Sequence, residues 1–291
     1  MEIQINKKVG IFIPTLNAEG SIDEIISAIN SSVIPVENVL VIDSESTDST
    51  VRKLKKYNVL TRTIARSSFS HGKVRRMAVE LMKSRVDFLV VMTQDVKLTS
   101  ASINKLIEGI QNNPRVGVSY GCQRSTHIDT VEYLDKKFNY PEKSQLKSKD
   151  LISQLGASTY FSSDAFAVYR IEAVLQVGNF PEDVKFAEDA YLAGKLILSE
   201  WQVFYNAEAI VYHDNLSNHL DLYKRYRNIA KFYQNERWLS DVFGGNMGKG
   251  RKLVLFELKQ ALVVKSPGLF LDVLVSSSLK LLAYKLPARS V

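Results

Sequence analysis

Short apolar runs alternate with amphipathic stretches over the first 120 residues, and this alternation constrains the fold most. Between the first two runs, Ile22, Ile25, Ile26 and Ile29 recur at helical spacing. Continuous apolar runs joined by helices are typical of parallel sheets covered on both faces. We therefore expect an α/β fold with such a sheet. Its strands are predicted at residues 9–13, 39–42, 58–64, 88–92 and 116–120.

The helices expected between these strands start near Ser21, after 48, at 71–84 and at 100–111. Ser21 and Glu24 form a candidate capping box. We expect loops and short helices at 121–165, a helix at 170–177 and another from 188. Further strands are expected at 201–206 and 209–212, and the last 75 residues read as mostly helical. This predicts a catalytic domain at 1–215, divided near residue 120, and a helical region at 216–291.

Several classes of protein are excluded by missing motifs. No G-x-G-x-x-G follows the first strand and no P-loop motif occurs, which argues against dinucleotide dehydrogenases and P-loop NTPases. The chain has no G-x-S-x-G elbow and no H-E-x-x-H. One cysteine, Cys122, excludes an intramolecular disulfide and a cysteine-rich zinc site. The N-terminus lacks a signal-peptide core, and we expect no membrane-spanning helix because uninterrupted apolar runs are too short.

Polar residues follow the predicted strands, where ligands of parallel sheets bind. Residues 43–48 hold three carboxylates and three hydroxyls that could accept hydrogen bonds from a nucleoside, or could simply cap a helix. Asp95 ends the 88–92 strand and could hold Mg²⁺ or Mn²⁺, although Asp is also a common turn residue.

Three further groups carry candidate chemistry. His71-Gly72 with Arg75 and Arg76 opens a predicted helix, where the cations could clamp a diphosphate or form a solvated face. Glu188 and Asp189 begin another helix, as the helix dipole favours, or one of them is a general base. His213 ends the 209–212 strand as a metal ligand or a structural histidine.

The order of these groups resembles glycosyltransferase family 2. The resemblance rests on 11–17 (IFIPTLN), 41–48 (VIDSESTD), 188–189 (ED) and 211–213 (VYH), and covers about residues 7–240. Residues 69–75 and 93–95 (TQD) look like its bacterial rhamnosyltransferase-type members, which build O-antigens and related surface polysaccharides. The resemblance implies the GT-A fold, which has a Rossmann-like nucleotide-binding sheet, and inversion of the anomeric configuration.

The resemblance also implies roles for individual residues. Asp189 would be the catalytic base, Glu188 would lie with it on the acceptor side, and Asp95 with His213 would bind Mg²⁺ or Mn²⁺. Arg75 would contact the diphosphate, Asp43 the base, and Gln94 the ribose. The implied nucleotide-sugar site as a whole consists of Pro14, Thr15, Asn17, Glu19, Asp43, Ser46, Arg75, Gln94 and Asp95.

Two positions depart from the family pattern. The aspartate-rich metal motif reads Gln94-Asp95-Val96 and lacks one carboxylate, and Arg76 stands where the H-G-x-x-R-N pattern has asparagine. The implied donor is dTDP-β-L-rhamnose, and the implied acceptor is a hydroxyl of a lipid-linked saccharide. A UDP-hexose donor and a non-catalytic sugar-nucleotide-binding scaffold remain alternatives.

The C-terminal end is basic and partly apolar. The chain has 38 basic and 31 acidic residues, and residues 251–291 alone hold seven basic against two acidic ones. Residues 269–275 are apolar except for Asp272. We expect a cytoplasmic protein whose C-terminal helices lie on the anionic inner membrane surface, or pack on the catalytic domain or a second copy. No nucleic-acid-reading motif accompanies the positive charge, so we expect no nucleic acid partner.

Overall fold

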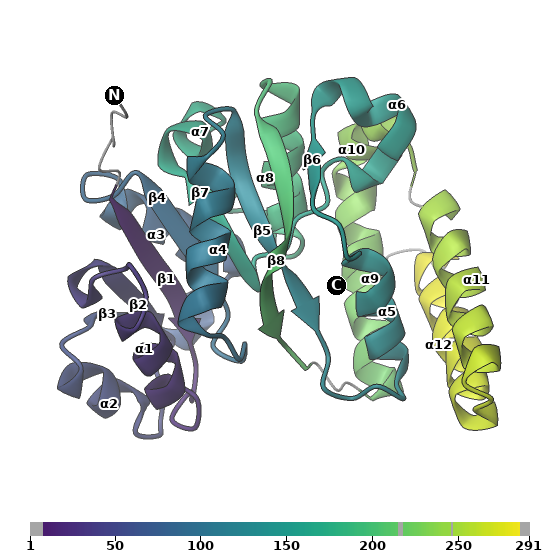
Figure 1. The fold of residues 1–291 in the computed structure, drawn as a ribbon, viewed down its shortest axis with the longest axis horizontal. Coiled ribbons are helices and arrows are strands. Elements are labelled where there is room, and N and C mark those ends of the chain that lie inside the picture. The colour runs from purple at the N-terminus through teal and green to yellow at the C-terminus, as the bar shows by residue number, and fades with distance from the viewer. Residues whose placement is uncertain (1–7, 215–217, 246, 286–291) are drawn as a thin grey trace.

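An eight-stranded sheet with the strand order β3-β2-β1-β4-β7-β5-β8-β6 organises the molecule (Figure 1). The computed structural model describes residues 8–214, 218–245 and 247–285. The predicted domain boundary at 215/216 lies outside the described residues. The strands are β1 (Val9–Thr15), β2 (Val39–Asp43), β3 (Leu60–Thr63), β4 (Phe88–Met92), β5 (Val116–Arg124), β6 (Gln145–Lys147), β7 (Phe166–Arg170) and β8 (Gln202–Tyr212).

The helices lie on both faces of this sheet and beyond its β6 end (Figure 1). The helices of the first part are α1 (Ile22–Asn30), α2 (Thr50–Lys56), α3 (His71–Met82), α4 (Ser100–Gln111), α5 (Val131–Asn139) and α6 (Ile152–Leu155). The later helices are α7 (Ile171–Gln176), α8 (Glu188–Leu198), α9 (His219–Asn235), α10 (Arg237–Phe243), α11 (Met247–Val263) and α12 (Pro267–Lys285).

The sheet is mixed, so the expectation of a purely parallel sheet is wrong. Strands β1 to β4 pair in parallel, but β7 enters between β4 and β5 and runs antiparallel to both. Strand β6 is also antiparallel to its neighbour β8. Because Phe166 pairs with Met92, the start of β7 lies at the edge where β4 ends. The residues that precede β7 therefore reach the same edge as Asp95.

Alternate residues of the strands enter two cores on opposite faces. Phe12 of β1 and Leu89 of β4 pack with α3, α7 and α8, whereas Ile13 and Val90 pack with α1 and α4. This is the two-residue period of a strand buried on both faces. Five strands are found where the apolar runs predict them, with β5 extended to Arg124.

Two local expectations are corrected. Ser21 does not form a side-chain cap at α1, since its hydroxyl donates to the carbonyl of Ala18, so the predicted capping box is absent. The strands expected at 201–206 and 209–212 are one strand, β8, which pairs with β5 across an irregularity between Gly121 and Cys122. The backbone can continue through this irregularity because a bulge absorbs the extra residues.

The last helices form a smaller assembly on α5 and α9 (Figure 1). Leu134 of α5 packs with Ala261 of α11 and with Leu269 and Val273 of α12. Helix α12 is nevertheless long and apolar enough to cross a membrane, and the expectation that no helix spans a membrane stays a prediction. By its length and composition alone, α12 does not indicate whether it lies in a membrane.

Candidate active site

The candidate site residues gather at one edge of the sheet. Thr15, Asp43 and Met92 end parallel strands there, and β8 ends next to β5 at the same edge. Three hydrogen-bonded groups follow one another along this edge: the loops after β1 and β2, the Asp95–His213 pair, and a buried charge cluster around Arg75.

Asp43 organises the first group and is fully buried. Its Oδ1 accepts hydrogen bonds from the hydroxyls of Thr15 and Ser46, and its Oδ2 accepts from the backbone N–H of Ser46 at 2.9 Å. The Ser46 hydroxyl oxygen in turn accepts from the backbone N–H of Asn17 at 2.8 Å. Asp43 and Ser46 thus shape the loops themselves, while their contacts with a nucleoside stay predictions.

The same loops are joined by side chains from their other residues. Asn17, whose φ of 52° is left-handed, accepts at Oδ1 from the N–H of Thr47. Glu19 accepts from the N–H of Ser49 at 3.0 Å. Gln94 accepts from the N–H of Leu16 at 2.7 Å and donates to its carbonyl at 2.9 Å. Gln94 therefore fixes the loop after β4 to the loop after β1, next to the buried Pro14.

Asp95 and His213 form the second group, as the resemblance implies. The Nε2 atom of His213 lies 3.2 Å from Oδ2 of Asp95, and its Nδ1 lies 2.9 Å from Oε1 of Gln123. Burial alone would raise the pKa of Asp95, but the hydrogen bond and charge of His213 outweigh it and lower that pKa to about 2. The Asp95 side chain is half exposed, so an ionised carboxylate faces the open edge.

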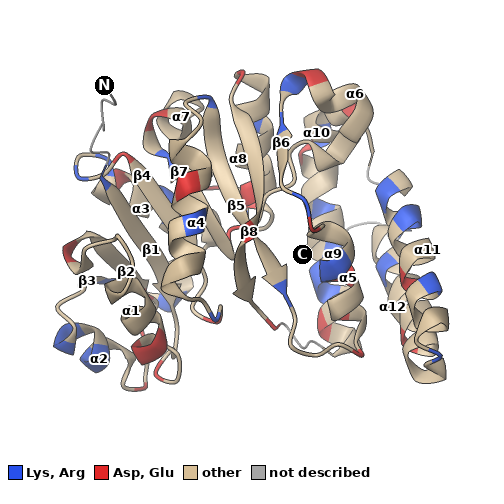
Figure 2. Ribbon diagram, viewed as in Figure 1, with Lys and Arg blue, Asp and Glu red and all other residues tan. Residues whose placement is uncertain are grey.

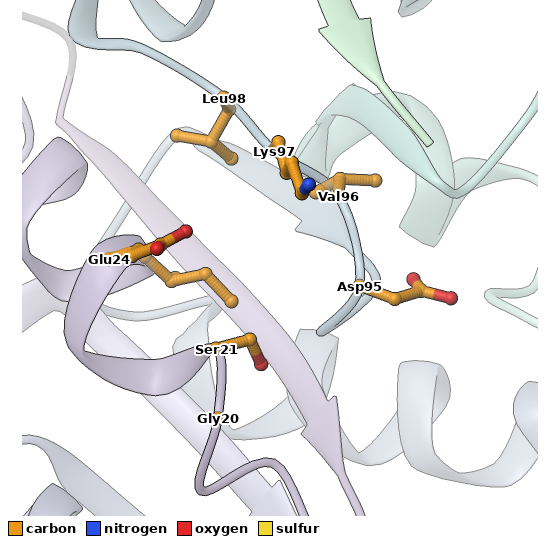
Figure 3. A pocket seen from close by; sticks show the side chains of 8 residues that line it. Gly20, Ser21, Glu24, Asp95, Val96, Lys97 and Leu98 are labelled. Carbon is orange, nitrogen blue, oxygen red and sulfur yellow. The ribbon is translucent and has the colours of Figure 1, made fainter. Parts of the chain in front are cut away.

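A small cavity of about 230 Å³ lies beside Asp95, between the start of α1 and residues 95–98 (Figure 3). Glu24 of α1 and Ser21, just before that helix, line it, and the Asp95 side chain points away from them (Figure 3). This volume is below the ~300–1,000 Å³ of sites that enclose a small molecule. The cavity can therefore be no more than part of a nucleotide-sugar site.

A buried arginine organises the third group. The Nε atom of Arg75, in α3, pairs with Asp164, and its guanidinium reaches Oε1 of Glu188 at 2.6 Å. All three side chains are almost completely buried. The guanidinium of Arg75 is thus engaged by two carboxylates. Its contact with a diphosphate stays a prediction.

Asp189 lies beside this cluster and is partly exposed. Its Oδ1 accepts from the N–H of Ala190 at 2.7 Å, and its Oδ2 lies 3.4 Å from the N–H of Asp164. Burial raises the pKa of Asp189, and the charge of Arg75 opposes that rise. A raised pKa makes a carboxylate a better proton acceptor, so Asp189 fits the chemistry of a general base.

The two carboxyl groups next to Asp189 also have raised pKa values. Burial raises the pKa of Glu188 to about 7 and that of Asp164 to about 6, against the opposing charge of Arg75. The chain enters α8 through Ala187, whose φ of 60° lies in the left-handed region. Such a conformation costs of order 1–3 kcal/mol for a residue with a Cβ, and it occurs here directly before Glu188 and Asp189.

Gly72 has a different role from the one its sequence context indicates. A Cβ at Gly72 would lie 2.0 Å from the carbonyl oxygen of Pro181. The close approach that this glycine permits is thus to the backbone before α8. His71 beside it is half-buried, and this partial burial, with the charge of Arg75, lowers its pKa to about 4.

Sequence reasoning missed two residues that connect the groups. Gln123 accepts from His213 through Oε1 and donates to Ser163 through Nε2 at 2.7 Å. Asp164 follows Ser163 and pairs with Arg75. The apolar run 166–169 was the available signal, since a strand there would have placed Asp164 at a strand end.

The chemistry of the Asp95–His213 pair fits a divalent cation. Carboxylate and imidazole can both coordinate such ions, and the bond from Nδ1 to Gln123 directs Nε2 toward Asp95. Within the described ranges, no cluster of three or more His, Cys, Asp or Glu side chains could hold a metal ion. Two protein ligands suffice where substrate phosphates and water complete the coordination, as is usual for Mg²⁺.

Comparisons with known proteins agree with this geometry. The family model described as Glycosyl transferase family 2 matches residues 10–178. The O-antigen chain rhamnosyltransferase RfbN of Salmonella typhimurium is 32% identical over 284 residues, which is 96% of this chain and 89% of that protein. The O-antigen chain rhamnosyltransferase WbaN of Salmonella anatum is 30% identical over 278 residues, 95% of this chain and 88% of that protein.

Solved structures share the fold at lower identity. A mannosyltransferase of Pyrobaculum calidifontis, in complex with GDP-Man and Mn²⁺, aligns with a TM-score of 0.61 and 12% identity over 96% of this chain and 87% of that one. S. aureus TarS 1–349 in complex with UDP aligns with a TM-score of 0.57 and 18% identity, over 95% and 89% of the two chains. These similarities confirm the GT-A fold, and the match to more than half of the chain with the full-length relatives shows that this enzyme belongs to glycosyltransferase family 2.

Proposed function

We propose that this glycosyltransferase transfers L-rhamnose from dTDP-β-L-rhamnose, with inversion, to a hydroxyl of a growing lipid-linked bacterial surface polysaccharide. The choice of sugar and of product class is supported by the similarity to two O-antigen chain rhamnosyltransferases, which match almost the whole chain. The observation that carries the mechanism is the placement of a partly exposed Asp189 beside the buried Arg75 cluster.

The reaction is a single displacement. The acceptor oxygen forms a bond to the anomeric carbon while the bond from that carbon to the diphosphate oxygen breaks. Asp189 takes the proton of the acceptor hydroxyl, and its raised pKa favours this transfer. Attack from the face opposite the leaving group converts a β-linked donor into an α-linked product.

Asp95 and His213 would hold Mg²⁺ or Mn²⁺ at the end of β4. A bound divalent cation would stabilise the negative charge that develops on the departing diphosphate. The side chains of the two neighbouring groups hold other parts of the site in position. Arg75 orients Glu188, while Gln94 and Asp43 hold the loops that would enclose the nucleoside.

A panel of sugar nucleotides tests this proposal. Release of nucleoside diphosphate is measured for dTDP-rhamnose and for UDP- and GDP-hexoses, with Mg²⁺, with Mn²⁺ and with EDTA. Selective turnover of dTDP-rhamnose, lost in EDTA and in Asp95→Asn, is the expected result. Turnover of a UDP-hexose alone would overturn the rhamnose assignment. A donor that raised the melting temperature without being turned over, even with acceptor present, would favour the non-catalytic scaffold. If no donor turned over or raised the melting temperature, the proposed donor site would be refuted.

We propose further that the enzyme is peripheral to the cytoplasmic face of the membrane. Exposed apolar side chains of α11 and α12 support this, among them Leu255, Leu262 and Leu271, each more than 60% exposed. Lysines and arginines accompany them on α11 (Figure 2). The apolar side chains could enter the lipid layer while the basic side chains contact anionic headgroups.

Flotation with vesicles tests the membrane proposal. The full chain should float with vesicles that contain anionic lipid, and Leu255→Asn/Leu262→Asn should reduce the floated fraction. Val33→Asn, at an exposed position after α1 and outside both C-terminal helices, is the matched control. A full chain that stays at the bottom of the gradient would contradict peripheral binding.

A further inference from the structure

A second cavity, of about 420 Å³, lies away from the strand-end edge between β6, α6 and the start of α11. Lys147 of β6 enters it beside Tyr120 and Tyr205, while Lys249 and Lys252 enter it from α11. Lys147 lies on the edge strand β6 and pairs with Val203, near the start of β8. Val203 precedes His213 by ten residues, roughly 30 Å along an extended strand. The Lys147 end of the cavity therefore lies far along β8 from His213, and the cavity shares no lining residue with the one beside Asp95.

The cavity is positively charged and has no acidic side chain. Three lysines line it, and none of its lining residues is Asp or Glu. Elsewhere in the described chain, buried lysines are paired: Lys280 with Asp135, and Lys136 with Glu132. Buried charges in proteins are normally paired in this way, so the buried Lys147 is unusual in having no acidic partner in this cavity. Lys249 beside it is half-buried, and Lys252 is exposed at the mouth of the cavity.

Aromatic rings and neutral oxygens surround the two innermost lysines. The Nζ atom of Lys147 lies 2.6 Å from the hydroxyl of Tyr120 and 3.0 Å from the carbonyl oxygen of Phe161, and it is nearly completely buried. Lys249 lies over the ring of Phe161 at 4.3 Å. Burial lowers the pKa of both amines, that of Lys249 to about 8, which indicates that neither has a compensating anion here.

The start of α11 adds donors to the same wall. Its first turn has no acidic residue, and Gly248 lines the cavity with open space around its Cα. Backbone N–H groups of a first helical turn favour anions. They supplement the lysines, which are the main source of charge.

We propose that this cavity binds a phosphate or diphosphate group of a ligand other than the sugar donor, with Lys147, Lys249 and Lys252 as its cationic contacts. The rings of Tyr120 and Phe161 provide a surface for an adjoining apolar or ring-shaped group. A lipid-borne diphosphate and a free phosphorylated compound share this chemistry. The inference does not depend on the identity of the donor sugar.

Calorimetric titration of the full chain tests the proposal with three probes: inorganic phosphate, inorganic pyrophosphate and a water-soluble short-chain prenyl diphosphate. The double variant Lys249→Gln/Lys252→Gln should weaken binding at least about tenfold, because it removes two of the three cationic contacts. The matched control Lys143→Gln/Lys259→Gln makes the same charge change at exposed positions outside the cavity and should bind like the wild type. Asp95→Asn should also bind like the wild type.

Each outcome decides the proposal. Tighter binding of the prenyl diphosphate than of pyrophosphate supports a lipid-borne ligand, and equal binding supports a free phosphate group. The proposal is overturned if no probe binds, or if the two double variants weaken binding equally. It is also overturned if only Asp95→Asn weakens binding, because the anion would then occupy the donor site.

Discussion

Two buried clusters in this enzyme each place one cation between two carboxylates. At the active-site edge, Arg75 pairs with Asp164 and Glu188. Among the C-terminal helices, Lys280 of α12 lies 3.0 Å from Asp135 of α5 and 3.7 Å from Glu257 of α11. The two clusters contain the same charges, but they have different surroundings and different consequences.

The difference lies in a third carboxylate and in the geometry of the cation. Arg75 has Asp189 beside its cluster, partly open to the edge of the sheet, and its planar guanidinium orients two partners at once. Lys280 is a point charge that joins three helices. The first cluster can therefore hold a base in position for chemistry, whereas the second fastens the C-terminal helices to α5.

The largest effect is expected for Asp189→Asn, which keeps the shape of the side chain but removes its ability to take a proton. Transfer to acceptor should fall ~10²–10⁴-fold, the usual contribution of a general base. Unfolding should change little, and release of nucleoside diphosphate in the presence of acceptor measures the loss. Asp183→Asn, at an exposed position on the preceding loop, is the matched control. A variant with wild-type turnover would show that Asp189 is not the base.

Arg75→Met should cause the largest loss of stability. It leaves Asp164 and Glu188 buried without a cation, and breaking a buried pair in this way costs ~3–5 kcal/mol. Urea denaturation measures the change in the free energy of unfolding. Arg62→Met, on the exposed surface of β3, should change that free energy by less than ~0.5 kcal/mol. Equal midpoints for the two variants would contradict the role of Arg75 as the centre of the cluster.

Lys280→Met should have a smaller and local effect. Burial raises the pKa of Glu257 to about 8, so this partner can remain neutral when the lysine is removed. We expect a loss below the ~3–5 kcal/mol of a fully charged buried pair, confined to α11 and α12. Hydrogen exchange of residues 267–285 should speed up while donor turnover stays unchanged. Lys259→Met on the exposed face of α11 is the control, and the comparison fails if both variants exchange alike.

The smallest effect is a difference in pH dependence. The folded carboxyl of Glu257 binds its proton more tightly than the unfolded one, whose pKa is 4.5, so its contribution to stability declines as pH rises from about 4.5 to about 8. For Glu188 the same decline should end near pH 7. Melting temperatures between pH 5 and pH 8 measure the slope. Glu257→Gln should flatten the upper part of the curve, and an unchanged slope would refute this assignment.

The part of the site formed by the first four strands could largely be predicted from local sequence patterns. Asp43 and Asp95 lie where apolar runs end, and parallel strands bring such ends to one edge. The hydrogen bonds made by the residues of these loops could not be predicted from the sequence. Gln94 was expected at the ribose, but its amide is bonded to the backbone of Leu16, a pairing across 78 positions of the chain.

The second half depended on the strand that the sequence reasoning missed. Without β7 there was no reason to place Asp164 near Arg75, 89 positions earlier. The motif therefore gave no sign that Gly72 makes room for Pro181 or that Arg75 pairs with carboxylates, and the diphosphate contact of Arg75 stays a prediction. The ED motif identified Glu188 and Asp189, but it did not indicate that Glu188 is buried while Asp189 is partly exposed.

The sequence by itself determined the α/β architecture, the edge at which the candidate site residues gather and the family, because apolar periodicity and short motifs are local properties of the chain. Only the tertiary structure decided which charges are paired and which stay open. It gave Arg75 and Lys280 their carboxylates and left Lys147 and Lys249 facing a cavity without one. The physical reason is that burial and long-range pairing set the energy of a charge, and both arise only when distant segments pack together.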